Sequence, residues 1–266
     1  MSKTGIVVMG AAGRMGATLV ELVQEDPELE LAGALETEAK LSKLQGLECR
    51  TGSDLSSFLQ GLQSAVVVDF THPESTSNNA LIAAQAGLPM VIGTTGFSQE
   101  QEKSLQQAAA KVPIFWAPNM SVGINVLLEL MPKLATLLGP EFDLEISEIH
   151  HKHKKDAPSG TAVKLGQILA DSREPQQGAP ELRYCREGMI GERPKQEIGI
   201  QTLRGGDVVG EHTVYFLGPG ERIDLTHRVY SRQTFAQGAL RVAKWIGSQS
   251  PSKLYSMSDF FAALIA

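Results

Sequence analysis

A glycine-rich turn directly after the first apolar run constrains the fold of this chain more than any other feature. Residues 10–16 read G-A-A-G-R-M-G, between a strand-like run over 4–9 and a helical pattern of apolar residues. In this context Gly10 permits a tight turn, Gly13 lets the backbone approach a pyrophosphate, and Gly16 lets the helix pack closely on the sheet. The helix N-terminus adds N–H donors for phosphate groups. The pattern predicts a dinucleotide site.

A single acidic residue supports this prediction. Glu36 lies 20 residues beyond Gly16, at the end of a second strand-like run over 29–35. A carboxylate at that position can bind the ribose hydroxyls of an adenosine. Glycine triplets also occur in ordinary turns, so the alternative is a structural turn beside a solvated glutamate. The strand–turn–helix context favours the dinucleotide site.

Strands and helices continue to alternate along the first half of the chain. Apolar runs over 65–70, 88–92 and 112–116 alternate with helical patterns over 75–86 and 98–110. Runs that are apolar throughout are typical of parallel strands covered on both faces. We therefore expect an α/β fold with a doubly wound parallel sheet.

Two loops fit the same site. Gly93-Thr94-Thr95-Gly96 and Ala117-Pro118-Asn119-Met120 each follow a strand-like run. Open α/β sheets bind ligands at the carboxyl ends of their strands, so the backbone of these loops can reach the nicotinamide end of a dinucleotide. Each loop taken alone is equally consistent with a plain turn.

The pattern of elements changes near residue 122. A long apolar helix over 122–138 and a strand over 142–149 precede a serine-capped helix from 159 to about 170. Turn signals then separate three consecutive strand-like runs, at 197–204, 207–217 and 222–230. Such a meander predicts an α+β region with an open mixed, mostly antiparallel sheet. The last strands carry apolar residues on both faces, so we expect one face to pack on helices and the other on another subunit.

A cluster of histidine and lysine residues follows the strand over 142–149. The run reads His150-His151-Lys152-His153-Lys154-Lys155. A solvated basic patch is the default interpretation of such a run. A metal site is less favoured, because neighbouring side chains on a strand point to opposite faces and no cysteine or carboxylate pair completes a ligand set. A nuclear-localisation signal would require longer basic runs.

The residues after this cluster favour a functional interpretation. Ser159 stands at a helix N-cap, and Gly160 and Thr161 occupy the first turn, where free N–H groups can bind a carboxylate or phosphate. Titratable cations beside an anion site suit an anionic substrate that must also receive a proton. Together with a hydride donor at the glycine turn, they indicate reduction of a conjugated or imine double bond.

These residues resemble the signature of the bacterial dihydrodipicolinate reductase family, also called 4-hydroxy-tetrahydrodipicolinate reductases. The most specific run is E-I-H-H-K-H-K-K-D-A-P-S-G-T-A, at residues 148–162. The other motifs are G-A-A-G-R-M-G at 10–16, D-F-T at 69–71, G-T-T-G-F at 93–97, A-P-N-M-S at 117–121 and G-D-V-V-G-E-H-T at 206–213. The resemblance implies NAD(P)H-dependent reduction of dihydrodipicolinate, formed from 4-hydroxy-tetrahydrodipicolinate, to tetrahydrodipicolinate in lysine and diaminopimelate biosynthesis.

The same resemblance implies a domain organisation and an assembly. A Rossmann-type dinucleotide-binding domain would comprise residues 1–121 and 231–266. A substrate-binding and oligomerisation domain would be inserted between them at 122–230. The family forms homotetramers through the sheet of the inserted domain, which agrees with the apolar strands noted above.

The resemblance also implies residue roles. His150 would be an acid–base group and Lys154 the proton donor, while His151, Ser159, Gly160 and Thr161 would bind the substrate. The residues expected to contact the nicotinamide cofactor are Gly10, Ala11, Ala12, Gly13, Arg14, Met15, Glu36, Gly93, Thr94, Thr95, Ala117, Pro118, Asn119 and Met120. Family members often carry arginine directly after the ribose-binding acid, where it meets the 2′-phosphate of NADP, but this chain has Thr37. The cofactor is therefore NADH, NADPH or both, and we expect NADH to be used at least as well.

Composition limits the partners and leaves two alternatives open. The net charge is −6, Cys49 and Cys185 are the chain's two cysteines, and no apolar run approaches the ~20 residues of a membrane span. We expect a cytoplasmic protein with a small dicarboxylate substrate and no metal, nucleic-acid or membrane partner. A dehydrogenase of an alcohol or semialdehyde would leave the histidine–lysine run without a use. An NAD sensor would need a further interaction domain.

Overall fold

The chain passes from one folding unit into a second and then returns to the first. The structure is a computed structural model that describes residues 3–62, 64–177 and 180–265. One unit comprises Met1–Val122 and Gln233–Ala266, and the other comprises Gly123–Arg232. The backbone thus crosses after residues 122 and 232, where the sequence suggested 121 and 230.

The first unit is built on a parallel sheet. From one edge to the other its strands are β3 (Thr51–Gly52), β2 (Leu29–Leu35), β1 (Thr4–Met9), β4 (Val66–Asp69), β5 (Met90–Ile92), β6 (Ile114–Trp116) and β12 (Leu254–Tyr255). The order 3-2-1-4-5-6 is that of a Rossmann sheet, whose direction of winding reverses between β1 and β4. The expected Rossmann-type doubly wound sheet is confirmed. Its carboxyl edge carries the glycine turn.

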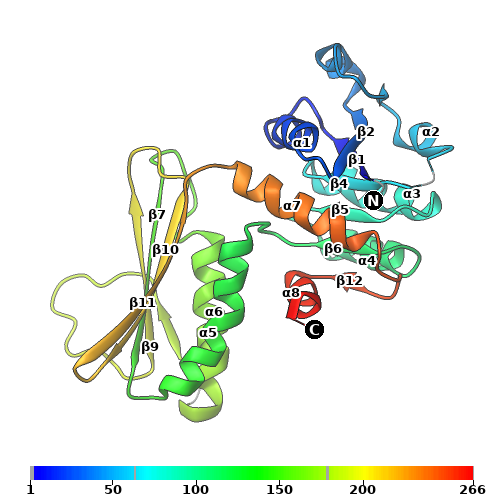
Figure 1. Cartoon of the computed structure of the whole chain (residues 1–266). Helices are drawn as coiled ribbons and strands as arrows, with labels where there is room; N and C mark the ends of the chain where they lie inside the picture. Colours follow the sequence, from blue (N-terminus) through cyan, green and yellow to red (C-terminus); the bar gives the residue numbers. More distant parts are fainter. Residues whose placement is uncertain (1–2, 63, 178–179, 266) are drawn as a thin grey trace. The chain divides into compact units, whose positions relative to one another are not determined.

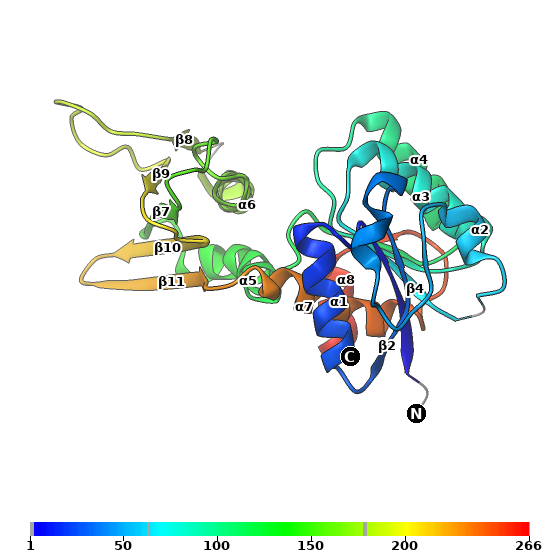
Figure 2. The same cartoon turned by 90° about the horizontal axis from the view of Figure 1, so that it is seen from above.

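Helices cover both faces of this sheet (Figure 2). One core packs Ile6 and Val8 against α1 (Arg14–Glu25), α7 (Gln233–Ile246) and α8 (Met257–Ile265). The other core packs Val7 and Val67 against α2 (Leu55–Leu59), α3 (Pro73–Gln85) and α4 (Gln99–Ala109). Alternate residues of each strand therefore enter different cores, which explains why the strands are apolar throughout. A short 3₁₀ helix, η1 (Glu38–Leu44), follows β2.

The second unit is a mixed sheet with two helices on one face (Figure 1). Its strands are, in spatial order, β11 (Glu221–Val229), β10 (Gly210–Gly218), β7 (Asp143–His150), β9 (Glu197–Arg204) and β8 (Glu181–Arg183). The helices are α5 (Val122–Leu138) and α6 (Gly160–Gln177). β10 runs antiparallel to β7 and β11, whereas β9 runs parallel to β7 and β8. The expected α+β unit with a mixed sheet is confirmed.

The predicted meander is wrong in one respect. β9 and β10 are consecutive in sequence but are not neighbours, because β7 lies between them. The backbone of the intervening turn bonds to the end of β7: the N–H of Gly205 donates to the carbonyl of His150 at 3.0 Å, and the N–H of His151 donates to the carbonyl of Val208 at 2.7 Å. Turn residues announce a reversal of the chain, but they do not specify which strand lies beside it.

The two faces of this sheet differ more than the sequence suggested. Val214 and Phe216 are fully buried under the helices. Tyr215, one residue out of phase, lies on the other face, and its hydroxyl is 3.0 Å from that of Ser147. The face away from the helices therefore mixes polar and apolar groups.

Residues 3–62, 64–177 and 180–265 contain neither a membrane-spanning helix nor a cluster of metal-binding side chains. No helix there has the length and apolarity needed to cross a bilayer. No group of three or more histidine, cysteine, aspartate or glutamate side chains within these ranges is arranged to hold a metal ion.

Candidate active site

The glycine turn has the geometry that a dinucleotide requires. Gly10 has a φ of 63°, a conformation that suits glycine. A Cβ on Gly16 would lie 2.1 Å from the carbonyl oxygen of Gly10, so only glycine allows α1 to start this close to β1. Gly13 caps α1 without a side-chain hydrogen bond. The turn thus leaves the helix start open for phosphate groups, with exposed Arg14 beside it.

Glu36 links the end of β2 to the glycine turn. Its side chain is buried, and its carboxylate accepts the N–H of Ala12 at 3.1 Å and the N–H of Thr37 at 2.9 Å. A negative charge therefore lies against the turn that would hold the adenosine half of the cofactor. Thr37 itself is exposed at the start of η1.

A buried aspartate organises the next loops along the carboxyl edge. Asp69, at the end of β4, is completely buried and accepts hydrogen bonds from the N–H and hydroxyl of Thr71 at 2.7 and 2.6 Å and from the amide of Asn79 at 2.8 Å. Its backbone carbonyl accepts the N–H of Gly93 at 2.9 Å. The hydroxyl of Thr76, which donates to Asp69, is 2.8 Å from that of Thr94. Sequence reasoning missed this network, although an acid inside an otherwise apolar run was a signal.

The loop after β6 lies at the same edge. Ala117 and Met120 are buried, while Pro118 is exposed and the Asn119 side chain accepts the N–H of Ser121 at 3.0 Å. The N–H of Ala117 donates a hydrogen bond to the carbonyl of Ile92 in β5 at 3.2 Å. The predicted cofactor residues thus lie at one edge of the sheet, in the turns after its strands and in the first turn of α1. The glycine cradle and the open helix start fit a nicotinamide dinucleotide.

Glu148 is the centre of the polar groups in the second unit. Its completely buried carboxylate has Oε2 2.6 Å from Nδ1 of His150, and Oε1 accepts the N–H of Ser159 at 2.9 Å. The guanidinium of Arg204 donates to both oxygens, at 2.8 and 2.9 Å. Burial by itself raises the pKa of Glu148, but the hydrogen bonds from Arg204, His150 and Ser159 outweigh it and hold the pKa at about 2. One carboxylate thus ties together β7, β9 and the start of α6.

His150 ends β7 with little exposure to solvent. Burial lowers the pKa of His150, the hydrogen bond that the ring donates to Glu148 opposes this, and the charges of Lys154 and Arg204 lower the pKa further. A Cβ on Gly210 would lie 3.0 Å from Nε2 of the ring. Glycine at 210 therefore leaves room beside the nitrogen that Glu148 does not hold.

The start of α6 is capped by Ser159. Its hydroxyl accepts the N–H of Ala162 at 3.2 Å and lies 2.9 Å from Nε2 of His212. Burial lowers the pKa of His212 to about 4, so this ring is neutral near pH 7. The first N–H groups of a helix lack intrahelical acceptors, and a Cβ on exposed Gly160 would meet no atom within 4 Å. Half-buried Thr161 follows in the first turn.

The loop between β7 and α6 carries the remaining predicted residues. Nζ of Lys154 lies 2.9 Å from a carboxylate oxygen of Asp156, and this hydrogen bond lowers the pKa of Asp156. Lys154 is the better shielded partner, with 22% of its side chain exposed against 60% for Asp156. The ring of His151 is half-buried and lies 6.2 Å from that of His153.

The structure therefore brings the predicted catalytic histidine and the helix start together, through residues to which sequence reasoning assigned no role. Glu148, Gly210 and His212 all lie inside runs that carry the family resemblance, which was the available signal. Arg204 had no such signal, because its partner is 56 positions away.

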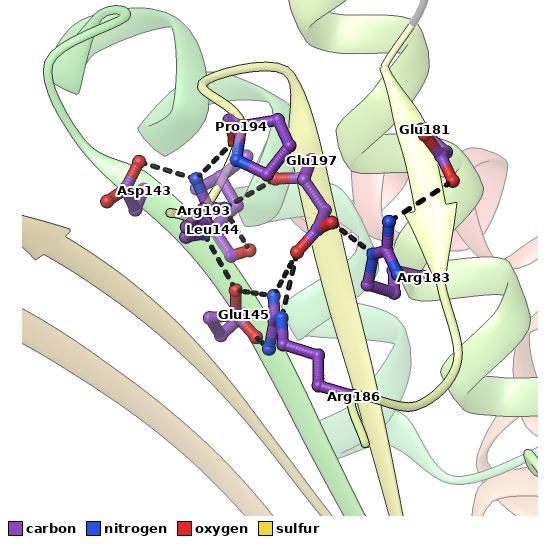
Figure 3. A network of polar contacts seen from close by, with 9 residues as sticks. All are labelled: Asp143, Leu144, Glu145, Glu181, Arg183, Arg186, Arg193, Pro194 and Glu197. Atoms are coloured by element: carbon purple, nitrogen blue, oxygen red, sulfur yellow. Dashed lines mark hydrogen bonds and ion pairs between the residues drawn. The ribbon is translucent and has the colours of Figure 1, made fainter. Parts of the chain in front are cut away.

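A second charged cluster lies on the opposite face of the same sheet (Figure 3). Arg186 donates to both oxygens of Glu145 at 2.6 and 2.9 Å and to Glu197 at 2.9 Å. Arg193 bonds Glu145 at 2.9 Å and Asp143 at 2.6 Å. These arginines belong to the loop over 184–196, between β8 and β9. Hydrogen bonds and ion pairs of the cluster thus attach this loop to the sheet.

Comparisons with known proteins agree over nearly the whole chain. Sequence profiles described as dihydrodipicolinate reductase, N-terminus and C-terminus, match residues 4–120 and 123–261. The 4-hydroxy-tetrahydrodipicolinate reductase of Oleidesulfovibrio alaskensis is 54% identical over 254 residues, which is 96% of this chain and 98% of that protein. That of Nitratidesulfovibrio vulgaris is 53% identical over 259 residues, 97% and 99% of the two chains.

Solved structures give the same result for the fold. A dipicolinate-bound dihydrodipicolinate reductase from Paenisporosarcina sp. TG-14 superposes with a TM-score of 0.76 at 29% identity, covering 96% of this chain and 97% of that one. A protein from Thermotoga maritima described as a probable dehydrogenase superposes with a TM-score of 0.58 at 14% identity, covering 98% of this chain and 93% of that one, and shows the fold alone.

Proposed function

This chain belongs to the dihydrodipicolinate reductase family, and we propose that its two units divide the family reaction between a cofactor site and a substrate site. It is an NAD(P)H-dependent oxidoreductase that reduces dihydrodipicolinate, formed from 4-hydroxy-tetrahydrodipicolinate, to tetrahydrodipicolinate in lysine and diaminopimelate biosynthesis. One observation carries the assignment of roles. Glu148 joins an acid–base histidine to the start of an anion-binding helix.

The first unit holds the nicotinamide cofactor, which supplies a hydride when bound. In this proposal the turn from Gly10 to Met15 binds the pyrophosphate through backbone N–H groups. Glu36 binds the adenosine ribose. The loops Gly93–Thr95 and Ala117–Met120 surround the nicotinamide end.

The second unit binds the dicarboxylate and provides the proton. The N–H groups of Gly160 and Thr161 hold one carboxylate, Ser159 keeps the helix start in place through its hydroxyl, and His151 contacts the ring or its second carboxylate. Lys154 releases Asp156 and protonates the carbon adjacent to the reduced position. His150 acts as the acid–base group beside it.

A coupled assay tests the proposal. The product of dihydrodipicolinate synthase is supplied with NADH or NADPH, and oxidation of the cofactor is followed by absorbance. We expect turnover with inhibition by pyridine-2,6-dicarboxylate, a planar mimic of the substrate. Turnover of a simple alcohol or semialdehyde without such inhibition would favour the alternative dehydrogenase.

We infer a cofactor preference from the end of β2. Glu36 has its carboxylate at the end of β2, where it would bind the ribose hydroxyls of NADH and repel a 2′-phosphate, and Thr37 lacks the guanidinium that would offset this repulsion. NADH should therefore be used at least as well as NADPH. Thr37→Arg should raise the ratio of kcat/KM values for NADPH over NADH, most strongly at low salt, where phosphate contacts are least screened. A wild-type preference for NADPH of tenfold, about 1.4 kcal/mol, would contradict this inference.

We also propose that the chain forms a homotetramer through the sheet of the second unit and works in the cytoplasm. Tyr215 and Leu217 lie on the face away from α5 and α6, where they offer partly apolar area to a second copy. Cys49 and Cys185 are both free thiols, which suits a reducing compartment. Sedimentation equilibrium of the full chain tests the tetramer, and a monomeric mass would contradict it.

A further inference from the structure

His150 shares the carboxylate of Glu148 with Arg204, a residue outside the predicted site. Glu148 is 2.6 Å from Nδ1 of His150, while Arg204 occupies both oxygens of the same carboxylate. We propose that Glu148 and Arg204 are positioning residues of the reaction: Glu148 holds His150 in the tautomer that presents Nε2 as a proton acceptor, and Arg204 offsets the charge of the carboxylate. This inference rests on the proposed function, because it takes His150 as the acid–base group.

The tautomer follows from the state of Glu148. With a pKa of about 2 this carboxyl group is ionised near pH 7 and only accepts hydrogen bonds. The proton between Glu148 and His150 therefore belongs to Nδ1 of the ring. A neutral imidazole with Nδ1 protonated has its lone pair on Nε2. A Cβ on residue 210 would lie 3.0 Å from Nε2. Because Gly210 has none, it leaves room beside that nitrogen.

The role of Arg204 follows from charge. A lone carboxylate at 2.6 Å would stabilise the imidazolium form and raise the pKa of His150. The bidentate guanidinium cancels that charge while leaving the hydrogen bond intact. Of the groups that face the ring, Lys154 also disfavours the imidazolium, and His212, whose ring centroid is 5.1 Å away, is itself neutral near pH 7. His150 is thus held neutral, so that Nε2 can take from solvent water the proton that the reduction consumes and pass it on in its acid–base role.

The same contacts also shape the site, and the test must separate the two effects. Arg204 donates to the backbone carbonyl of Asp156 at 2.6 Å, and Glu148 accepts the N–H of Ser159. Loss of either side chain would therefore lower activity even if neither influenced the ring. The direction of the change in the pKa of His150 distinguishes a positioning role from a purely structural one.

The experiment is an NMR titration of the histidine ring protons in the full chain, with His150 identified by loss of its signal in His150→Asn. Glu148→Gln removes the negative charge, so the pKa of His150 should fall by about one unit, whereas Arg204→Gln should raise it by about one unit. Arg204→Lys keeps a charge but not the bidentate geometry, and should give a smaller rise. Arg222→Gln, which breaks an exposed ion pair with Asp224 in the same sheet, should leave the pKa unchanged.

Activity is measured in parallel. The limb of the kcat/KM profile that reports His150 should move in the same direction as the pKa of the ring in each variant. The far-UV circular dichroism spectrum and the urea midpoint show whether each variant is folded. Shifts of the ring pKa in the same direction in Glu148→Gln and Arg204→Gln, or no shift in folded variants, would overturn the proposal. If Arg204→Gln does not fold, Glu148→Gln and Arg204→Lys still test the two directions. The pKa of the His150 ring could shift in opposite directions in the two variants while the pH profile of kcat/KM stays the same. That result would support the effect of Glu148 and Arg204 on the ring, and it would overturn the acid–base role of His150 in the proposed function.

Discussion

Two clusters of glutamate and arginine lie on opposite faces of one sheet, and they use the same ion-pair chemistry for different ends. Glu145 and Glu148 are three positions apart on β7, so their side chains point to opposite sides. Each carboxylate receives a bidentate arginine, Arg186 for Glu145 and Arg204 for Glu148. On the helix-covered face a histidine shares the carboxylate. On the other face, among the residues that the structure describes, Arg193 is a further partner of Glu145 (Figure 3).

The difference lies in what the carboxylate can influence. The guanidinium of arginine stays charged throughout the ordinary pH range. The arginines around Glu145 and Glu197 can therefore hold a loop, but their charge does not change with pH. The cluster around Glu148 contains His150, a titratable group whose pKa burial lowers from its ordinary value. A buried ion pair therefore becomes part of a chemical site when one of its members is shared with a titratable group. The predictions below test this distinction.

The largest effect should come from Lys154, the proposed proton donor beside the histidine cluster. Lys154→Ala should lower kcat by roughly 10²–10⁴-fold, because a positioned acid contributes on that scale. Cofactor binding should be unchanged, since Lys154 lies in the second unit. Steady-state kinetics and titration with NADH measure the two quantities. Near-normal turnover would show that Lys154 belongs to a solvated basic patch. The functional difference between the cluster around Glu148 and the cluster around Glu145 would then lose its support.

Acid should act on the histidine-containing face. The folded-state pKa of His212 is about 4, below its ordinary value of 6.5, so the unfolded chain binds a proton first as the pH falls. The stabilising contribution is complete above pH 6.5 and is lost as the pH falls towards 4, by up to about 3 kcal/mol. His212→Gln should show a shallower loss of stability over this range. The pKa values of His150 and His227 are also lowered, so the free energy of unfolding of His212→Gln should still fall as the pH falls. Urea unfolding at pH 7 and pH 4.5 measures the difference, and equal slopes would contradict the prediction.

The arginine-only cluster should affect stability without affecting the pH profile. Arg186→Gln leaves Glu197, which is 3% exposed, with one fewer cationic partner. Breaking a buried pair costs more than breaking a surface pair, and because Arg186 is partly exposed we expect a loss of about 1–3 kcal/mol in the free energy of unfolding. The pH dependence of kcat/KM should match that of the wild type. A shifted profile would show that the two faces are coupled.

The smallest effect should come from an exposed pair on the same face as the arginine cluster. Arg228 donates to Glu211 across β11 and β10 at 2.8 Å, with about half of its side chain exposed. Solvent and salt screen such pairs, so Arg228→Gln should leave the urea midpoint and the kcat/KM profile unchanged within error. A measurable loss would show that exposure alone does not separate this pair from the buried clusters.

Local signals in the sequence were enough for the architecture of the first unit. The strand–turn–helix at Gly10–Gly16 and the alternation of apolar runs depend on hydrogen bonds and side-chain periods that span only a few residues. The expected strands over 4–9 and 29–35 coincide with β1 and β2, and in the second unit the expected helix over 122–138 coincides with α5. The histidine–lysine run, equally local, predicted the proposed substrate site.

The contacts that organise that site were decided by the tertiary structure. Arg204 is 56 positions from Glu148, and His212 is 53 positions from Ser159. They meet because β7 lies between β9 and β10, an arrangement that the consecutive strand signals did not predict. Periodicity identifies which residues face a core, since it reflects the backbone geometry of one element. Which distant strand lies beside it depends on the packing of the whole unit, and that packing placed an arginine and a second histidine around the carboxylate of Glu148.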